Sequence, residues 1–353
     1  MNKNIIKHYT DSNIPFVAYK LPCEENFYLA NLTDEKPFIF DFLDKPPSDN
    51  GFVVFPFDNR ETNGWWFNKK NIKQFNIEKV DKFSDENVKY KNYTSQSTFE
   101  IYKEQFFQMK KELLSENVKK VVLSRIINIP FVDINRLYQF FPKLCNNNPD
   151  AFVYILSTPQ TGIWAGASPE LLINKESNNY TLISLAGTKQ NRETEIENWT
   201  AKEFDEQGIV SDFIDKQLKT FKVDNYKKIG PNVMPANSVI HLKTEYRFNT
   251  NVLAGKVGKF VQALHPTPAI SGEPKLNAMD IIRKTEQHKR KFYGGFIGIV
   301  SESKINLFVN IRCVNFENEI GNIYVGGGLT KSSIAEQEWQ ETEMKSQTIL
   351  QSL

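Results

Sequence analysis

The stretch that decides the fold is KVVLSRIINI, residues 120–129. Its Val and Ile side chains branch at Cβ, which is typical of a strand packed in a sheet. Just before it, Ser97-Thr98-Phe99-Glu100 has the pattern of a capping box that opens a helix. On that helix a set of apolar residues at helical spacing forms one face: Phe99, Tyr102, Phe106, Met109 and Leu113.

Strands and helices follow one another unevenly from this stretch to the end of the chain. The expected strands are 151–157, 161–167, 180–186, 238–248, 294–300, 305–315 and 321–326. The expected helices are 133–144, 196–219, 254–263, 276–290 and 333–351, the last opening at a second capping box, Ser333 to Glu336. Short turns and the lack of a regular βαβ rhythm predict an α+β fold with a largely antiparallel sheet.

The first ninety-odd residues differ in character from the rest. Short runs rich in Phe, Val and Ile predict antiparallel strands at 16–21, 27–32, 37–43 and 51–57. Residues 68–98 are polar and rich in Lys and Asn, which favours a surface excursion. We therefore separate a β-rich part, residues 1–94, from the main body, residues 95–353, and expect the former to complete the same core.

Composition excludes several classes of protein. The 44 basic and 42 acidic residues give a net charge of +2, so nothing favours nucleic acid or an anionic membrane as a partner. Cys23, Cys145 and Cys313 form neither a CxxC pair nor a disulfide framework, which indicates a reducing cytoplasm. The N-terminus lacks the apolar run of a signal peptide, and no run of ~18 apolar residues predicts a membrane span. We expect a cytoplasmic, soluble protein.

A glycine run precedes the last expected helix: Gly326-Gly327-Gly328-Leu329-Thr330-Lys331. It has neither the Walker spacing nor GxGxxG, so it does not indicate a nucleotide site. Backbone N–H groups at a turn into a helix would favour an anion such as a carboxylate. A tight structural turn explains the run equally simply.

The helix that follows carries Glu338, Glu341 and Lys345 on one face. Two carboxylates and an ammonium together can hold a hard cation and an anionic ligand. On spacing alone, a solvated charged face with an i, i+4 pair is the simpler interpretation.

Lys120 and Glu170 each lie beside apolar strand residues. Desolvation would raise the pKa of the carboxyl and lower that of the lysine, which suits general acid–base chemistry near neutral pH. Alternatively, each is a strand-edge charge that reaches water. His241 and His265 have no partner at metal-ligand spacing, so zinc is not expected.

Taken in order, the segments of the main body resemble the chorismate-utilising enzymes. The resemblance rests on KVVLSR (120–125), ASPELL (167–172), LAGT (185–188), KEFDEQ (202–207), IHLKT (240–244), LHPTPAISGEPK (264–275), YGGFIG (293–298), NIRC (310–313), YVGGGL (324–329) and EWQETEMK (338–345). It implies a single chorismate-binding α+β domain of two stacked, mostly antiparallel β-sheets flanked by helices, with the site in a cleft between them. Residues 95–353 would be the catalytic core, and residues 1–94 a divergent N-terminal part.

Three features of the resemblance favour the isochorismate synthases within this family. Lys120 matches the members that activate water, Ala186 is not the lysine of aminodeoxychorismate synthases, and HPTPA (265–269) is similar to isochorismate synthases. The implied reaction turns chorismate into isochorismate, for menaquinone or catecholate siderophore biosynthesis, in a monomer without an amidotransferase subunit. A salicylate synthase, which would go on to eliminate pyruvate, and a non-catalytic chorismate-binding relative are the alternatives.

The resemblance also implies a role for each site residue. Lys120 would be the base that deprotonates water for attack on C2, and Glu170 the acid that protonates the leaving C4 hydroxyl. Glu206 and Glu341 would ligate Mg2+, with Glu338 beside them, directly or through a water. The remaining groups would hold the substrate's carboxylates and ring: Gly187, Thr188, His241, Arg312, Tyr324, Gly327, Gly328 and Lys345.

Overall fold

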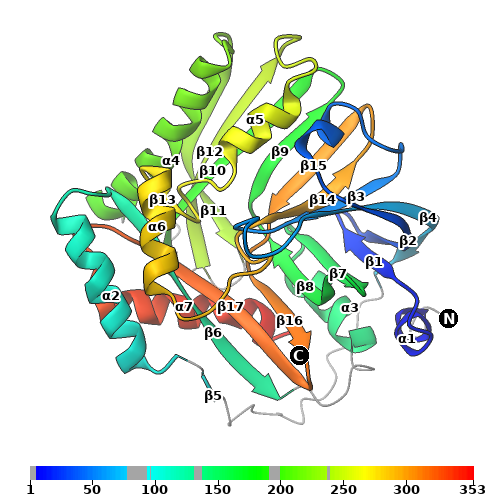
Figure 1. The fold of residues 1–353 in the computed structure, drawn as a ribbon, viewed down its shortest axis with the longest axis horizontal. Coiled ribbons are helices and arrows are strands. Elements are labelled where there is room, and N and C mark those ends of the chain that lie inside the picture. The colour runs from blue at the N-terminus through cyan, green and yellow to red at the C-terminus, as the bar shows by residue number, and fades with distance from the viewer. Residues whose placement is uncertain (1–4, 78–93, 96, 131–136, 191–198, 237–238) are drawn as a thin grey trace.

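The computed structural model describes residues 5–77, 94–95, 97–130, 137–190, 199–236 and 239–353 (Figure 1). Most of the expected surface excursion and the first residues of the helices expected at 133–144 and 196–219 lie outside the described residues. No helix in the described ranges is long and apolar enough to cross a membrane.

The structure contains both helices and strands, as the predicted α+β class requires. The helices are α1 Ile5–Asp11, α2 Phe99–Leu114, α3 Leu137–Asn147, α4 Ala201–Thr220, α5 Val257–Leu264, α6 Lys275–Thr285 and α7 Ala335–Leu350. The strands are β1 Phe16–Lys20, β2 Asn26–Pro37, β3 Gly51–Phe55, β4 Trp65–Asn76, β5 Thr94–Ser95, β6 Lys120–Pro130, β7 Phe152–Thr158, β8 Gly162–Ser168, β9 Leu171–Glu176, β10 Asn179–Gln190, β11 Lys227–Ala236, β12 Val239–Asn249, β13 Gly272–Glu273, β14 Phe296–Val300, β15 Lys304–Val309, β16 Cys313–Glu317 and β17 Ile320–Leu329.

The described strands form one hydrogen-bonded network of 17, and every pair is antiparallel. From β6 the neighbours run β17, β16, β8, β7, β1, β2, β4, β3, β14, β15, β9, β10, β12 and β11. The short strands β13 and β5 pair with the other edge of β6. Strand β1 pairs with β7, and strand β3 pairs with β14. The N-terminal strands β1 to β4 therefore lie between β7 and β14 in the sheet and connect them.

The network folds over, so its two ends form stacked layers. Five strands separate β7, with Phe152, from β15, with Phe308, along the order. The ring centroids of these two residues are nevertheless 4.5 Å apart and the rings are stacked. Buried side chains of β1, β3, β14 and β17 belong to the same apolar cluster between the layers. The α+β class and the antiparallel layers are confirmed, and the two expected sheets are parts of one continuous network.

Two expected strands are wrong. Residues 40–43 of the expected strand 37–43 form a 3₁₀ helix, Phe40–Leu43, whose aromatic rings pack on Phe38 and Phe55 without a strand partner. The single strand expected at 305–315 is two, β15 and β16, because the chain turns sharply at Arg312, where φ is 50°. The strands β4, β9 and β11 were not predicted, since polar and charged residues interrupt their alternation.

The two predicted capping boxes also differ from the structure. Helix α2 is capped one residue later than expected, by the Thr98 hydroxyl, which accepts from the Ile101 N–H. Ser333 does not cap α7; its hydroxyl accepts from the Thr330 N–H in the preceding turn. Side-chain caps compete with local turns for the same hydroxyl, and spacing alone does not decide between them.

Candidate active site

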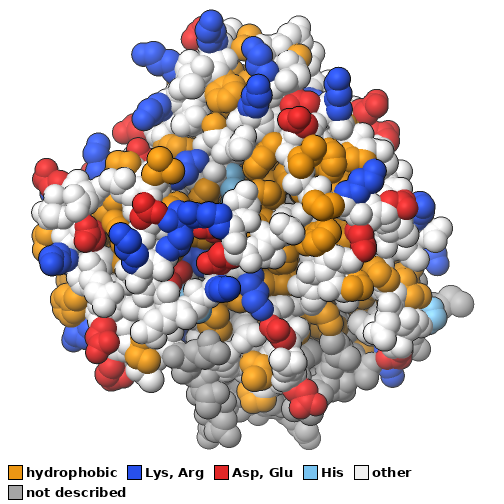
Figure 2. Space-filling view, in the orientation of Figure 1, with side chains coloured by type: hydrophobic (Ala, Val, Ile, Leu, Met, Phe, Trp, Pro, Cys, Tyr) orange, Lys and Arg blue, Asp and Glu red, His pale blue; other side chains and the backbone are white. Residues whose placement is uncertain are grey.

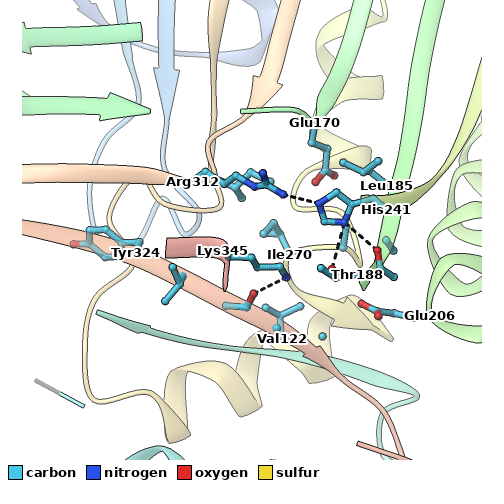
Figure 3. A pocket seen from close by; sticks show the side chains of 18 of the residues that line it. Val122, Glu170, Leu185, Thr188, Glu206, His241, Ile270, Arg312, Tyr324 and Lys345 are labelled. Atoms are coloured by element: carbon cyan, nitrogen blue, oxygen red, sulfur yellow. Dashed lines mark hydrogen bonds between the residues drawn. The ribbon is translucent and has the colours of Figure 1, made fainter. Parts of the chain in front are cut away.

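One pocket gathers most of the predicted site residues from distant segments (Figure 3). Strands β6, β10, β12 and β17, helices α4 and α7, and the connections β8–β9 and β15–β16 supply its walls. In the space-filling view, basic side chains gather near the middle of the face beside α6 (Figure 2). The predicted residues that line the pocket are Glu170, Gly187, Thr188, Glu206, His241, Arg312, Tyr324, Gly327, Gly328 and Lys345.

Glu170 is a buried carboxyl in the connection between β8 and β9, with 4% of its surface exposed. Its backbone is fixed to the end of β15, because its carbonyl accepts from the Val309 N–H. Desolvation raises the pKa of Glu170 to about 8, although Lys120, Lys345 and Arg312 act in the opposite direction. The carboxyl therefore keeps its proton at neutral pH and can deliver it to a leaving group.

Lys120, the first residue of β6, is completely buried, and its Nζ lies 2.8 Å from Glu206 Oε1. No described residue, Glu206 included, offers this ammonium an acceptor in good hydrogen-bond geometry. An ammonium has three N–H groups, so most of its bonding capacity is free for a water or a substrate atom. Lys120 is not itself part of the pocket lining, but it touches the lining through Glu206 and Gly328.

Arg312 and His241 form a buried pair that fixes the state of the histidine. Arg312 Nη2 lies 2.6 Å from His241 Nε2, and His241 Nδ1 lies 2.9 Å from the Gly187 carbonyl oxygen. Since a guanidinium only donates, Nε2 must accept, and the ring proton is on Nδ1. Desolvation, and to a smaller extent the positive charge of Arg312, hold the pKa of His241 well below its ordinary value, so the ring is neutral.

Gly187 is required at this position by its backbone. It lies in a β-bulge of β10, between Ala186 and Thr188, with φ of 72°. A Cβ there would lie 3.1 Å from Glu203 Cβ. The bulge turns the Gly187 carbonyl toward His241, which is how LAGT contributes to the site.

Three carboxylates from two helices approach the glycines of β17. A Cβ on Gly327 would lie 3.1 Å from Glu338 Oε2 and 3.7 Å from Glu341 Oε1, and one on Gly328 would lie 2.3 Å from Glu206 Oε1. Such an all-oxygen set suits Mg2+. However, no three His, Cys, Asp or Glu side chains of the described residues are yet close enough together to hold a metal ion.

Each of these carboxylates instead contacts a lysine. Besides Lys120 and Glu206, Lys345 lies 2.7 Å from Glu341 and Lys202 lies 2.8 Å from Glu338. Burial and the neighbouring Glu341 raise the pKa of Glu338 to about 7. The donors fit a magnesium site in type and place, provided that the lysine contacts rearrange.

The glycine run is not a turn into a helix. Gly326, Gly327 and Gly328 lie inside β17, paired with Ser124, Leu123 and Val122 of β6, and α7 begins only at Ala335. The expectation of an anion site at that helix N-terminus is therefore wrong. The glycines instead leave room for carboxylates, and the Gly326 carbonyl accepts from Lys345 Nζ at 2.9 Å.

Tyr324 is buried beside the pocket, with its ring stacked on Trp164 and Tyr293. Desolvation raises its pKa, so its hydroxyl stays protonated. In Figure 3 this hydroxyl points away from Arg312 and His241.

Arg125 of β6 holds the helix that carries Glu338 and Glu341. Its guanidinium lies over the ring of Trp339 at 3.6 Å, donates to Thr342 Oγ1 at 2.8 Å, and pairs with Glu343. These contacts fix both the rotation and the height of α7 against the sheet.

Sequence reasoning missed some residues at the site. Lys202 lies four residues before Glu206, on the same face of α4, and this i, i+4 spacing was the available signal. Ile270 and Tyr293 line the pocket from loops, where no periodicity marks them.

Comparison with known proteins agrees with this geometry. The family model described as "Chorismate binding enzyme" matches residues 57–353, and the chain belongs to this family. Among curated relatives, isochorismate synthase EntC of Escherichia coli (strain K12) is 29% identical over 245 residues, covering 66% of this chain and 62% of that protein. Isochorismate synthase DhbC of Bacillus subtilis is 25% identical over 269 residues, covering 72% and 68%.

The fold is also shared with solved structures. A putative 2,3-dihydroxybenzoate-specific isochorismate synthase, DhbC from Bacillus anthracis, aligns with a TM-score of 0.79 at 22% identity, over 95% of each chain. MenF, the menaquinone-specific isochorismate synthase from Escherichia coli, aligns with a TM-score of 0.78 at 18% identity, over 96% of this chain and 88% of that one.

Proposed function

We propose that this chain is an isochorismate synthase that converts chorismate to isochorismate in the presence of Mg2+. One observation carries the proposal: Glu170, a buried carboxyl protonated at neutral pH, lines the pocket, and the buried amine of Lys120, which has spare bonding capacity, touches that lining through Glu206. The relatives named as isochorismate synthases support the same reaction.

In the proposed reaction, Lys120 acts as the neutral amine: it takes a proton from a water as the water oxygen bonds to C2 of the ring, and it releases that proton to solvent before the next turnover. The ring double bonds shift, the bond from C4 to its hydroxyl oxygen breaks, and Glu170 protonates that oxygen so that it leaves as water. One water is consumed and one released, so the sum is an isomerisation. In Figure 3, Glu170 and Glu206 approach the pocket from different sides, and Lys120 is on the side of Glu206.

Charge in the pocket favours a dianion such as chorismate. Arg312 keeps its charge at neutral pH even though burial lowers its pKa to about 10. Its planar guanidinium suits a carboxylate, and the neutral His241 adds no charge beside it. Lys345 adds a second cation to the lining.

Glu206, Glu341 and Glu338 are the proposed ligands of Mg2+. Bound Mg2+ supplies positive charge that attracts and orients the ring carboxylate of the substrate. Gly327 and Gly328 keep the space between these carboxylates free of side chains.

The test is to incubate the purified protein with chorismate and Mg2+, with and without EDTA, and to separate the products by chromatography. Isochorismate as sole product, abolished by EDTA, is the expected result. Salicylate with pyruvate would instead identify a salicylate synthase. No consumption of chorismate would contradict any catalytic role and favour a binding protein.

A matched pair of variants separates catalysis from stability. Lys120→Met should abolish turnover, since methionine cannot accept a proton. Lys20 is equally buried, but it donates to backbone carbonyls, including that of Pro149 at 2.6 Å, outside the pocket lining. Lys20→Met should therefore lower stability while the surviving folded protein keeps its turnover, and equal loss of turnover in both variants would refute the assignment of Lys120.

A further inference from the structure

Lys202 differs from the other two lysines at the carboxylate cluster formed by Glu206, Glu338 and Glu341. Lys120 is completely buried, and Lys345 also donates to the Gly326 carbonyl. The Lys202 ammonium pairs with Glu338. Its side chain is 22% exposed, whereas that of Glu338 is 1% exposed.

The Lys202 ammonium interacts electrostatically with all three carboxylates of the cluster. Its Nζ donates to Glu338 Oε1 at 2.8 Å, and the charges of Glu341 and Glu206 also act on it. A single positive charge that interacts with three carboxylates takes the electrostatic place of a metal ion. It also compensates the charge of the buried Glu338, because Ser333, another partner of this carboxylate, contributes only a neutral hydroxyl.

We propose that Lys202 is the internal counter-cation of the carboxylate cluster, and that a divalent cation binds here by displacing its ammonium from Glu338. The inference rests on the proposed function in one respect, that these glutamates are the magnesium ligands. Among the described residues, no three potential ligands lie close enough together to bind a metal ion. The proposal explains this, because each of the three carboxylates contacts a lysine.

The position of Lys202 allows its ammonium to move away from Glu338 more easily than the other two lysines can move from their glutamates. It belongs to the first turn of α4, and its partly exposed chain can move its ammonium into water while the helix stays in place. Lys120 has no such outlet, since it is completely buried. Magnesium binding then requires at least the Lys202–Glu338 ion pair to break, which lowers the affinity of the folded protein for the metal.

The first test is calorimetric titration of Mg2+ into wild type, Lys202→Met and Lys103→Met. Lys103, on α2, is the matched control, because it forms an exposed ion pair with Glu336. Glu336 lies on α7, the helix that also carries Glu338. Lys202→Met removes the competing cation and should tighten Mg2+ binding about fivefold or more, because a partly buried charge pair is stronger than an exposed one. Lys103→Met should bind like wild type.

The second test observes the displacement in the unaltered protein. Reductive methylation followed by peptide mass spectrometry measures how accessible each lysine amine is, with and without saturating Mg2+. Methylation of Lys202 should rise with Mg2+ while that of Lys103 stays constant. If Lys202 remains equally protected at saturating Mg2+, the inference is overturned, and the Lys202–Glu338 pair is a permanent part of the site.

Chorismate turnover, measured separately, distinguishes the two proposals. Metal-dependent exposure of Lys202 without isochorismate formation would leave the inference intact and refute the proposed function. Magnesium-dependent isochorismate formation with Lys202 still protected would do the reverse.

Discussion

Replacing Glu170 by glutamine should stabilise the folded protein while it destroys the activity. In the folded chain the pKa of Glu170 is about 8, against an ordinary value of 4.5. Between these two values the unfolded chain has released its proton and the folded chain has retained it. The folded state is therefore penalised progressively as pH rises from about 4.5 to about 8.

The size of this penalty follows from the difference between the pKa of Glu170 in the folded and in the unfolded chain. At 1.36 kcal/mol per pH unit it is about 3 kcal/mol at pH 7, and it approaches its limit of about 5 kcal/mol above pH 8. Glutamine has nearly the same shape and never ionises, so these figures are upper bounds for the stability gained by Glu170→Gln. Its amide cannot deliver a proton, and loss of a general acid lowers the rate by about 10²- to 10⁴-fold.

Two assays check both halves of the prediction. Urea unfolding at pH 5, 7 and 8.5 should show the stability difference between Glu170→Gln and wild type growing with pH. Glu104→Gln, at an exposed position of α2, is the control and should show no such trend. In wild type, kcat/KM for isochorismate formation should fall as pH rises through about 8. A stability difference independent of pH, or Glu170→Gln activity within tenfold of wild type, would refute the reasoning.

Three further substitutions test the rest of the site. Arg312→Lys should lower kcat/KM by about 10- to 100-fold, because lysine loses the bidentate grip on a carboxylate and the fixed contact with His241; unchanged steady-state kinetics would contradict this role. Gly187→Ala should cost about 1–3 kcal/mol in urea unfolding, since φ is 72° and its Cβ would meet Glu203; a neutral effect would mean that the bulge relaxes. Arg125→Met should cost about 2–4 kcal/mol and weaken Mg2+ binding in calorimetry, because α7 loses its contacts with β6; Mg2+ affinity equal to wild type would show that α7 is held by packing alone.

Local sequence signals predicted those parts of the fold whose physics is local. The β-branched residues of 120–129 give β6, and the helical spacing of the apolar residues on 99–113 gives α2. Periodicity failed where a contact from elsewhere in the chain supplies the stabilisation. Residues 40–43 became a 3₁₀ helix because Phe38 and Phe55 pack on their rings, and polar β4 became a strand because β2 and β3 pair with it.

The candidate site divides in the same way. Residue identity and family order were enough to select Glu170, Glu206, His241 and Arg312, which the structure brings to one pocket. The same information did not show that His241 is neutral, since its protonation depends on a guanidinium 71 positions along the chain.

The sequence by itself thus determined which chemical groups are available and which strands and helices have a local signal, because those depend on residue type and short-range spacing. The tertiary structure alone decided the charge state of Glu170, the tautomer of His241 and the pairing of Lys202 with Glu338. Burial and contacts between distant segments set these properties, and neither is a property of any local stretch of the chain.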